Sequence, residues 1–183
     1  MSRDDHELLD RSADGDRAAF ESFVSSHADA VFRFLRVHTE SEADAEDALQ
    51  EVFMAAWRGA AGFRGGSGRA WVLTIARNAA HRLYRRRVGE PAHFVDLEST
   101  EVLGLQAGWG QPDGGQEDDV DVLRRAFERL SSEDREILAL RELEGFSGEE
   151  TADVLGLSLA AMKSRLHRAR LRLTAAVREA GDD

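Results

Sequence analysis

Basic side chains gather in one short stretch near the carboxyl end of the chain, SLAAMKSRLHRARLRL, which runs from residue 158 to residue 173. The stretch holds five lysines and arginines and no acid, although the whole chain has a formal net charge of -11. Its apolar residues recur as one helical stripe, formed by Leu159, Met162, Leu166, Ala169 and Leu173. Most of its basic side chains fall on the opposite arc, where arginine can read guanine and lysine or arginine can hold phosphates. The pattern favours nucleic-acid binding over the alternative, a solvated basic face whose alkyl stems cover the core.

The residues before this stretch predict the element that presents it. Ser147 and Glu150 have the spacing of a capping box, which opens a short helix that ends before Gly156. Ser158 is a suitable cap for the helix that follows. Two helices separated by Gly-Leu-Ser are typical of a helix-turn-helix, whose second helix enters the major groove of DNA.

Positive charge gathers in a second place, in the first half of the chain. Residues 61–87 contain seven arginines and no acid, whereas residues 88–121 contain nine acids and no base. Two basic segments in an otherwise acidic chain indicate two separate anionic contacts rather than a uniformly basic surface.

The apolar pattern is helical on both sides of one irregular segment. Residues 88–119 contain both prolines of the chain, several glycines and an acidic run, so they predict a flexible linker. Two roles are open for its acids. They either compete with DNA phosphates for the basic surfaces of the free chain, or they only keep a spacer soluble. No strand-like alternation is convincing. The sequence therefore predicts an all-α protein of two small helical domains, 1–87 and 120–183, joined by a flexible acidic linker, with the helix-turn-helix in the second domain.

The helices of the first domain can be placed approximately. Apolar residues at helical spacing predict a helix from about Phe20 to His38, and Ser41 followed by Asp44 resembles a capping box that opens the next one, to about Arg58. Glycines over residues 59–68 predict a loop, and a third helix is expected from Arg69 to Arg87.

Composition narrows the class of protein. With 183 residues, 42% hydrophobic and 32% charged, the chain has the composition of a soluble globular protein. It has no run of about 18 apolar residues that would span a membrane, and its amino terminus lacks the features of a signal peptide. Cysteine is absent, the six histidines lack metal-ligand spacing, and no phosphate loop or nucleophile elbow is present. We expect a cytoplasmic protein without catalysis, metal or cofactor.

Three motifs together resemble the extracytoplasmic-function (ECF) sigma factors of the bacterial sigma-70 family. LSSEDREILALRELEGFSGEETADVLGLSLAAMKSRLHRARLRL resembles their C-terminal domain. DAEDALQEVFMAAW, at residues 44–57, resembles their core-polymerase-binding helix, and RAWVLTIARNAAHRLYRRR, at residues 69–87, resembles their promoter −10 helix. The motifs stand in the family's order. The resemblance implies a sigma factor that binds core polymerase and directs promoter recognition and transcription initiation, under the control of an anti-sigma factor.

The resemblance also implies partners and surfaces. The first domain would bind the β′ coiled coil of the polymerase through Asp44, Asp47, Gln50 and Glu51, because acids on an exposed helix can pair with arginines of a partner. Further partners would be the polymerase β flap, promoter DNA and an anti-sigma factor that is commonly membrane-anchored, whereas this chain would not itself enter the membrane.

The two DNA elements would meet different residues. A protein that binds an unstacked base in a pocket and holds the phosphates of a single strand needs aromatic, cationic and hydroxyl groups. For the −10 element these are Phe63, Arg64, Ser67, Arg69, Asn78, His81, Arg82 and Arg85. For the −35 element they are Ala160, Lys163, Ser164, Arg165, His167, Arg168 and Arg172.

The chain departs from the family pattern at three places. Family members often have a bulky residue where Gly148 stands, and a small residue followed by Thr-Val where Ala160, Ala161 and Met162 stand. Two alanines offer methyl contact to thymine but no hydrogen bond. Arg82 replaces an acid that is expected on the −10 helix.

Two other classes of protein are conceivable. A conventional helix-turn-helix regulator that binds duplex DNA as a dimer would use residues 158–173 but would leave the motifs of the first domain without a role. An enzyme is the third class, and turnover of a nucleotide by the isolated protein would support it.

Overall fold

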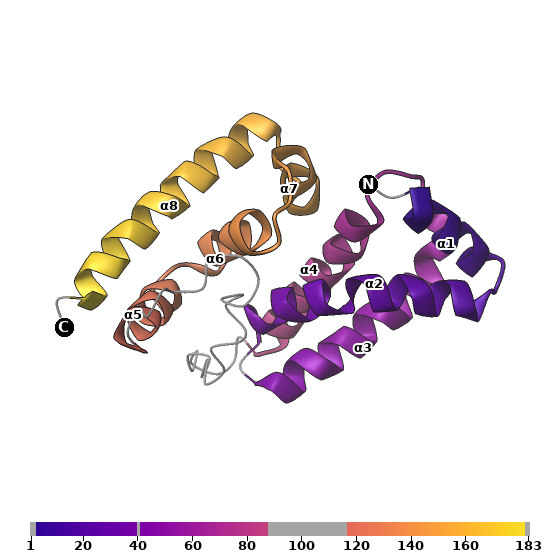
Figure 1. Ribbon diagram of the computed structural model, residues 1–183, viewed down its shortest axis with the longest axis horizontal. Coiled ribbons are helices and arrows are strands. Elements are labelled where there is room, and N and C mark those ends of the chain that lie inside the picture. The colour runs from indigo at the N-terminus through magenta and orange to yellow at the C-terminus, as the bar shows by residue number, and fades with distance from the viewer. Residues whose placement is uncertain (1–2, 40, 88–116, 182–183) are drawn as a thin grey trace. The chain divides into compact units, whose positions relative to one another are not determined.

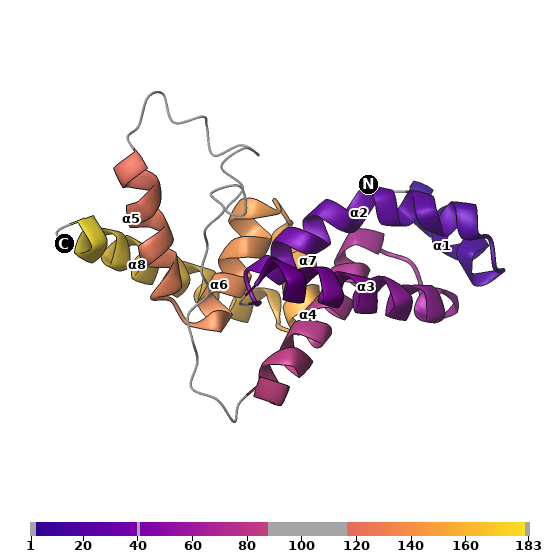
Figure 2. The same ribbon diagram turned by 90° about the horizontal axis from the view of Figure 1, so that it is seen from below.

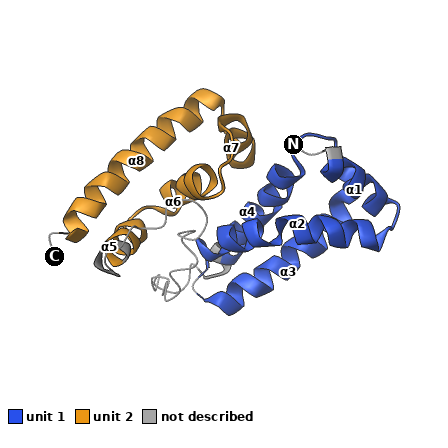
Figure 3. Cartoon of the chain, in the orientation of Figure 1, with its two compact units in different colours: residues 1–92 blue, residues 93–183 orange. Residues whose placement is uncertain are grey.

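The computed structural model describes residues 3–39, 41–87 and 117–181, and within these ranges every regular element is a helix (Figure 1). The chain divides into two compact units, residues 1–92 and 93–183 (Figure 3). These findings confirm the all-α prediction with two helical domains. Most of the segment 88–119, predicted as a flexible acidic linker, lies outside the described residues, so its flexibility and its effect on DNA binding stay predictions. None of the described helices combines the length and the apolar character needed to cross a membrane.

The described part of the first unit contains four α-helices and one short 3-10 turn. They are α1 (Arg3–Ala13), α2 (Arg17–Arg36), α3 (Glu42–Gly59), η1 (Ala60–Gly62) and α4 (Gly68–Arg87). Helices α2, α3 and α4 pack on one another, and α1 packs on α2 and reaches η1 and α4 (Figures 1 and 2). The fully buried side chains at their centre include Phe23, Val31, Leu35, Val52 and Leu73. The three helices predicted from residue 20 onward are confirmed to within a few residues.

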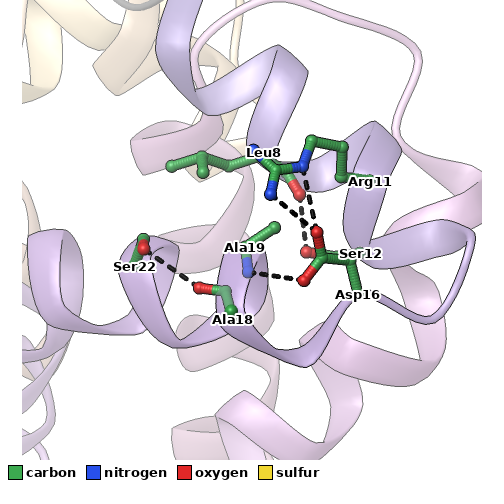
Figure 4. Close-up of polar contacts among 7 residues, drawn as sticks. All are labelled: Leu8, Arg11, Ser12, Asp16, Ala18, Ala19 and Ser22. Carbon is green, nitrogen blue, oxygen red and sulfur yellow. Dashed lines mark hydrogen bonds and ion pairs between the residues drawn. The ribbon is translucent and has the colours of Figure 1, made fainter.

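Helix α1 was not predicted, and a polar network fastens it to α2. Asp16 is the N-cap of α2, and its Oδ1 accepts a hydrogen bond from the Ala19 N–H at 3.1 Å (Figure 4). Its Oδ2 accepts hydrogen bonds from Nε and Nη2 of Arg11, at 3.0 and 2.7 Å. The Ala19 N–H, followed by the Arg11 guanidinium, lowers the pKa of Asp16. The carboxylate therefore both caps α2 and holds the last turn of α1.

The described part of the second unit consists of α5 (Glu117–Glu128), α6 (Ser132–Leu138), a π-helical turn η3 (Ala139–Leu143), α7 (Gly148–Leu155) and α8 (Leu159–Gly181). Helices α5, α6 and α7 all pack on α8. Residues 117–119, expected at the end of the linker, belong to the first turn of α5. This helix is held by apolar contacts with α8, among them Ala126 with Ala176 and Ala180. These partners are about 50 residues away in the sequence, so local composition could not show that the helix begins inside the predicted linker.

The helix-turn-helix forms as the sequence predicted. Ser147 and Glu150 complete a reciprocal capping box at the start of α7, with the Ser147 Oγ accepting from the Glu150 N–H at 3.2 Å. Gly156 follows α7 in the left-handed conformation, with φ of 65°, which glycine adopts without steric cost. The Ser158 Oγ then accepts from the Ala161 N–H at 3.2 Å and opens α8. Each of these contacts spans only a few residues.

Candidate nucleic-acid and polymerase interfaces

The apolar stripe of α8 faces the rest of the second unit. Met162, Leu166 and Ala169 are buried against it, whereas Leu159, at the first turn, is 37% exposed. The side chains predicted to read the −35 element are exposed on the other side, except Arg165, which is half-buried; the exposed ones are Ala160, Lys163, Ser164, His167, Arg168 and Arg172. The structure therefore brings the predicted −35 residues together on one helical surface.

The basic residues of α8 fall into two groups that the sequence did not distinguish. Within the described part of the chain, Lys163, Arg165 and Arg168 take part in no ion pair. Arg170 instead donates its Nε–H to the Glu142 Oε1 at 2.9 Å, and Arg172 donates from Nη1 to the Asp134 Oδ2 at 2.7 Å. Both acceptors belong to the segment formed by α6 and η3. Two arginines thus fasten α8 to that segment. The three unpaired cations lie in the amino-terminal half of the helix, whereas the exposed Arg178 lies in its last turn.

Arg172 differs from the other candidates because its partner is buried. The Asp134 side chain is 3% exposed, whereas that of Arg172 is 58% exposed. A buried carboxylate that loses its cation is costly. A phosphate contact by Arg172 would therefore compete with an intramolecular pair that helps to hold α6 on α8.

Two of the departures from the family pattern meet in space. A Cβ at Gly148 would lie 3.0 Å from the Met162 Cε and 3.2 Å from the Leu159 Cδ1. The long methionine side chain, which stands where the family often has valine, thus occupies the space that a larger residue at position 148 would need. The glycine and the methionine are therefore complementary in the packing of α7 against α8.

Replacing Gly148 by leucine should lower the free energy of unfolding by about 1–2 kcal/mol, because the core next to it has no room for the added methylenes. In a chain that also carries Met162→Val, the same replacement should cost less than half as much. Urea unfolding of the full chain, followed by helical circular dichroism for all four variants, measures this coupling. An equal cost in both backgrounds would contradict the complementary packing.

The acidic face of α3 lies on the surface of the first unit. Asp47, Gln50 and Glu51 are exposed, while Asp44 is half-buried and its Oδ2 accepts from the Ser41 hydroxyl at 2.7 Å. Met54 is 54% exposed on the same face, and it is not among the residues predicted from the sequence. Its spacing from Asp47 and Glu51, at i+7 and i+3, was the signal that could have revealed it. The face therefore combines acids with one exposed apolar side chain.

The residues predicted for the −10 element lie in the loop before α4 and along α4 itself. Phe63 is only 6% exposed, and its ring packs against Trp71 at a centroid distance of 5.5 Å. The Ser67 Oγ accepts from the Ala70 N–H at 3.2 Å, so it serves as a helix cap. Arg64 is exposed and donates from Nη1 to the Ala61 carbonyl at 2.9 Å. The loop is thus held from within and leaves one cation on its surface.

Farther along the same element, Asn78, His81 and Arg82 are exposed at i, i+3 and i+4 of α4, and Arg69 is half-buried in its first turn. Arg85 also belongs to α4, but its side chain is outside the described part. In the residues that the structure describes, no three histidine, aspartate or glutamate side chains are grouped as metal ligands would be.

These features define a class of protein: a two-unit helical protein whose second unit offers a basic helix-turn-helix to DNA and whose first unit offers an acidic helix and an arginine-rich one. Known families bear this out. Residues 23–89 match the family described as Sigma-70 region 2, and residues 121–173 match Sigma-70, region 4. The chain is 32% identical over 172 residues to the ECF RNA polymerase sigma factor SigM of Mycobacterium tuberculosis, covering 93% of this chain and 83% of SigM.

Solved structures agree. The chain resembles CnrH of Cupriavidus metallidurans, solved with the cytosolic domain of CnrY, with a TM-score of 0.71 and 30% identity over 96% of this chain and 98% of CnrH. It also resembles the sigma factor RpoE of Bartonella quintana, solved with the anti-sigma factor NepR, with a TM-score of 0.67 and 28% identity over 87% and 96% of the two chains. The chain belongs to the ECF sigma factors of the sigma-70 family. Like other members, it binds RNA polymerase and directs promoter recognition and transcription initiation.

Proposed function

We propose that the two units divide the work of promoter recognition. Residues 1–87 bind core polymerase and the −10 element, residues 120–183 bind the −35 element, and residues 88–119 link them. The observation that carries the proposal is the unpaired basic surface on α8, the second helix of a helix-turn-helix, in a chain of net charge -11. Charge concentrated on that surface directs one face of the unit to DNA.

The −35 contacts of the proposal divide by chemistry. Lys163, Arg165 and Arg168 have no ionic partner among the described residues, so binding DNA costs them no existing contact. Arginine can bind guanine through two hydrogen bonds, and lysine can hold a phosphate. Ala160 can meet a thymine methyl group, and the exposed Ser164 and His167 offer hydrogen bonds. Arg172 can contact DNA only while its guanidinium also remains paired with Asp134.

The −10 contacts use the first unit. The groups proposed to meet a single strand are Arg64 in the loop, Arg69 in the first turn of α4, and Asn78, His81, Arg82 and Arg85, which recur at helical spacing farther along α4. Basic residues hold the phosphates of that strand, and polar groups can meet an unstacked base. Phe63 and Ser67 act indirectly, by holding the loop in place. Phe63 is buried, and Ser67 caps α4.

Asp44, Asp47, Gln50 and Glu51 would bind the β′ coiled coil of the polymerase, and the second unit would contact the β flap. Charged groups across such an interface steer association and select partners. Met54 adds an apolar side chain, which a partner can cover when the surrounding acids are paired.

An anti-sigma factor would control this chain. CnrH and RpoE were each solved in complex with another protein, CnrY and the anti-sigma factor NepR. The likeness of the whole fold to both supports a comparable partner for this chain. The proposal places its activity in the cytoplasm, with the polymerase, and assigns it no catalysis of its own.

Arg168→Ala should weaken binding of the −35 duplex by about 1–2 kcal/mol, since it removes one base-reading side chain. The promoter would first be mapped by run-off transcription with core polymerase, and a duplex with its −35 element would then be titrated with the full chain. Arg178→Ala is the matched control, because Arg178 is an exposed arginine of α8 beyond the helix-turn-helix. Equal affinities of the Arg168 variant and the parent chain would contradict the assignment.

A further inference from the structure

Helix α1 lies outside the residues that match the sigma-70 region 2 family, which begin at residue 23. It nevertheless packs on η1 and reaches the start of α4, the two elements that flank the loop proposed for the −10 strand (Figures 1 and 2). Two of its residues, Asp5 and His6, make side-chain contacts toward this loop. Their geometry suggests a role for α1 that goes beyond covering the core.

Asp5 joins α2 to the first turn of α4. Its Oδ1 lies 3.0 Å from the Nε2 of His27, and the side chains of the two residues are 8% and 10% exposed. Because a carboxylate can only accept, the His27 Nε2 carries the proton of this hydrogen bond. The rest of Asp5 lies against Gly68, the first residue of α4: a Cβ there would be 2.7 Å from the Asp5 Cβ and 2.8 Å from its Oδ2. A carboxylate at the start of a helix is also favoured by the helix dipole.

A chain of ring contacts closes around the same point. His27 packs edge-on against Phe23 at 4.6 Å, and Phe23 lies 6.3 Å from Trp71. Trp71 lies 5.5 Å from Phe63, and Phe63 lies 5.7 Å from His6, all measured between ring centroids. His6 is next to Asp5 in the sequence, so the contacts form a closed circuit through α1, α2, α4 and the loop. Phe63 cannot move without disturbing this circuit.

We propose that Asp5 is a positioning residue for −10 recognition: with His27 it forms a buried latch that holds α1 against Gly68 and Phe63, and thereby sets the loop 62–68 and the first turn of α4. This inference rests on the proposed function of that loop. The loop contains Gly65 and Gly66, both at positive φ (95° and 94°), a backbone that offers little stiffness of its own. Its conformation therefore depends on the contacts at its two ends, and at the α4 end Asp5 adds to the cap that Ser67 provides.

Hydrogen exchange in the full chain tests the latch without any ligand. In Asp5→Ala the His27 donor is left buried without its acceptor, so amides of residues 62–70 should open about tenfold more often. Asp5→Asn keeps an acceptor oxygen and should show a smaller change. Asp4→Ala is the matched control, because Asp4 is the exposed neighbour on α1. Unchanged exchange over 62–70 in Asp5→Ala would overturn the proposal.

Gly68→Ala tests the contact between Asp5 and Gly68 by changing the α4 residue instead. This variant also provides a test of the proposal if Asp5→Ala fails to fold. Glycine to alanine in a helix ordinarily stabilises a protein by restricting the unfolded chain. Here the new Cβ would collide with Asp5, so exchange over residues 62–70 should rise as it does in Asp5→Ala. Slower exchange in that segment would mean that α1 does not hold the loop.

A binding assay with holoenzyme tests the effect on function. The DNA is a mapped promoter fragment whose −10 element is unpaired. At each non-template position of that element, binding of the fragment with the natural base is compared with binding of a fragment that has an abasic site there. The parent should prefer the natural base at one or more positions, and Asp5→Ala should lose most of that preference while retaining affinity for core and for the −35 duplex. A purely structural defect of the first unit would also lower the affinity for core polymerase, which the same unit is proposed to bind. If parent and variant prefer the natural base equally, the latch proposal is wrong. If the parent shows no preference, the −10 assignment is wrong, and the hydrogen-exchange results alone then test whether Asp5 holds the loop.

Discussion

Arg172→Ala should lower the free energy of unfolding of the second unit by about 2–3 kcal/mol. The side chain looks like one more DNA contact in the sequence, but its Nη1 lies 2.7 Å from the Oδ2 of Asp134, a carboxylate that is 3% exposed. Removing one member of a buried pair leaves the other charged and desolvated, and the exposure of Arg172 reduces the cost below that of a fully buried pair. Chemical unfolding of the full chain, with the transition of each unit followed separately, gives this value.

Two further variants separate this role from a phosphate contact. Arg170→Ala is the matched control, because its partner Glu142 is 29% exposed and exposed pairs contribute little, so the loss should be small. Replacing Asp134 and Arg172 together should cost less than Arg172→Ala alone, because no buried charge remains. An Arg172→Ala chain with unchanged stability and a lower salt dependence of DNA binding would mean that the residue acts on phosphates after all.

Reversing the charge of Asp47 and Glu51 to lysine should weaken the binding of core polymerase at least about 100-fold. Each substitution removes an acid that can pair with a cation of the partner and adds a like charge, and close charge pairs in interfaces couple by roughly 1.5–7 kcal/mol. Both side chains are exposed, whereas Ala45, Ala48 and Val52 of α3 are buried, so the helix should keep its packing. Titration of labelled core polymerase measures the affinity.

The control for this variant has the same change of net charge at another place. Glu21 and Asp29 are exposed on α2, a different helix from the one that carries the acidic face, and their reversal to lysine should leave the affinity for core close to that of the parent. Circular dichroism of both double variants verifies that the helices persist. If the two variants lose affinity equally, overall charge rather than the acidic face of α3 governs the association.

The sequence by itself determined the features that depend on neighbours within a few residues. The capping pairs at Ser41, Ser147 and Ser158 were readable because a cap joins a side chain to a backbone N–H three residues on. The turn at Gly156 was readable because only glycine adopts its backbone conformation at no cost. The apolar stripe of α8 followed from the helical period alone. These local rules gave the all-α fold and the helix-turn-helix.

Tertiary structure decided which of the predicted side chains are available. Arg170 and Arg172 are paired because Glu142 and Asp134, 28 and 38 residues earlier, lie against α8. Phe63, predicted as a residue that meets the −10 element, is buried where α1 packs near it, and α1 itself was not predicted. A period or a motif describes one segment, whereas burial and pairing depend on which segments meet. Only the packed fold could separate the arginines that hold the protein together from those that remain for DNA.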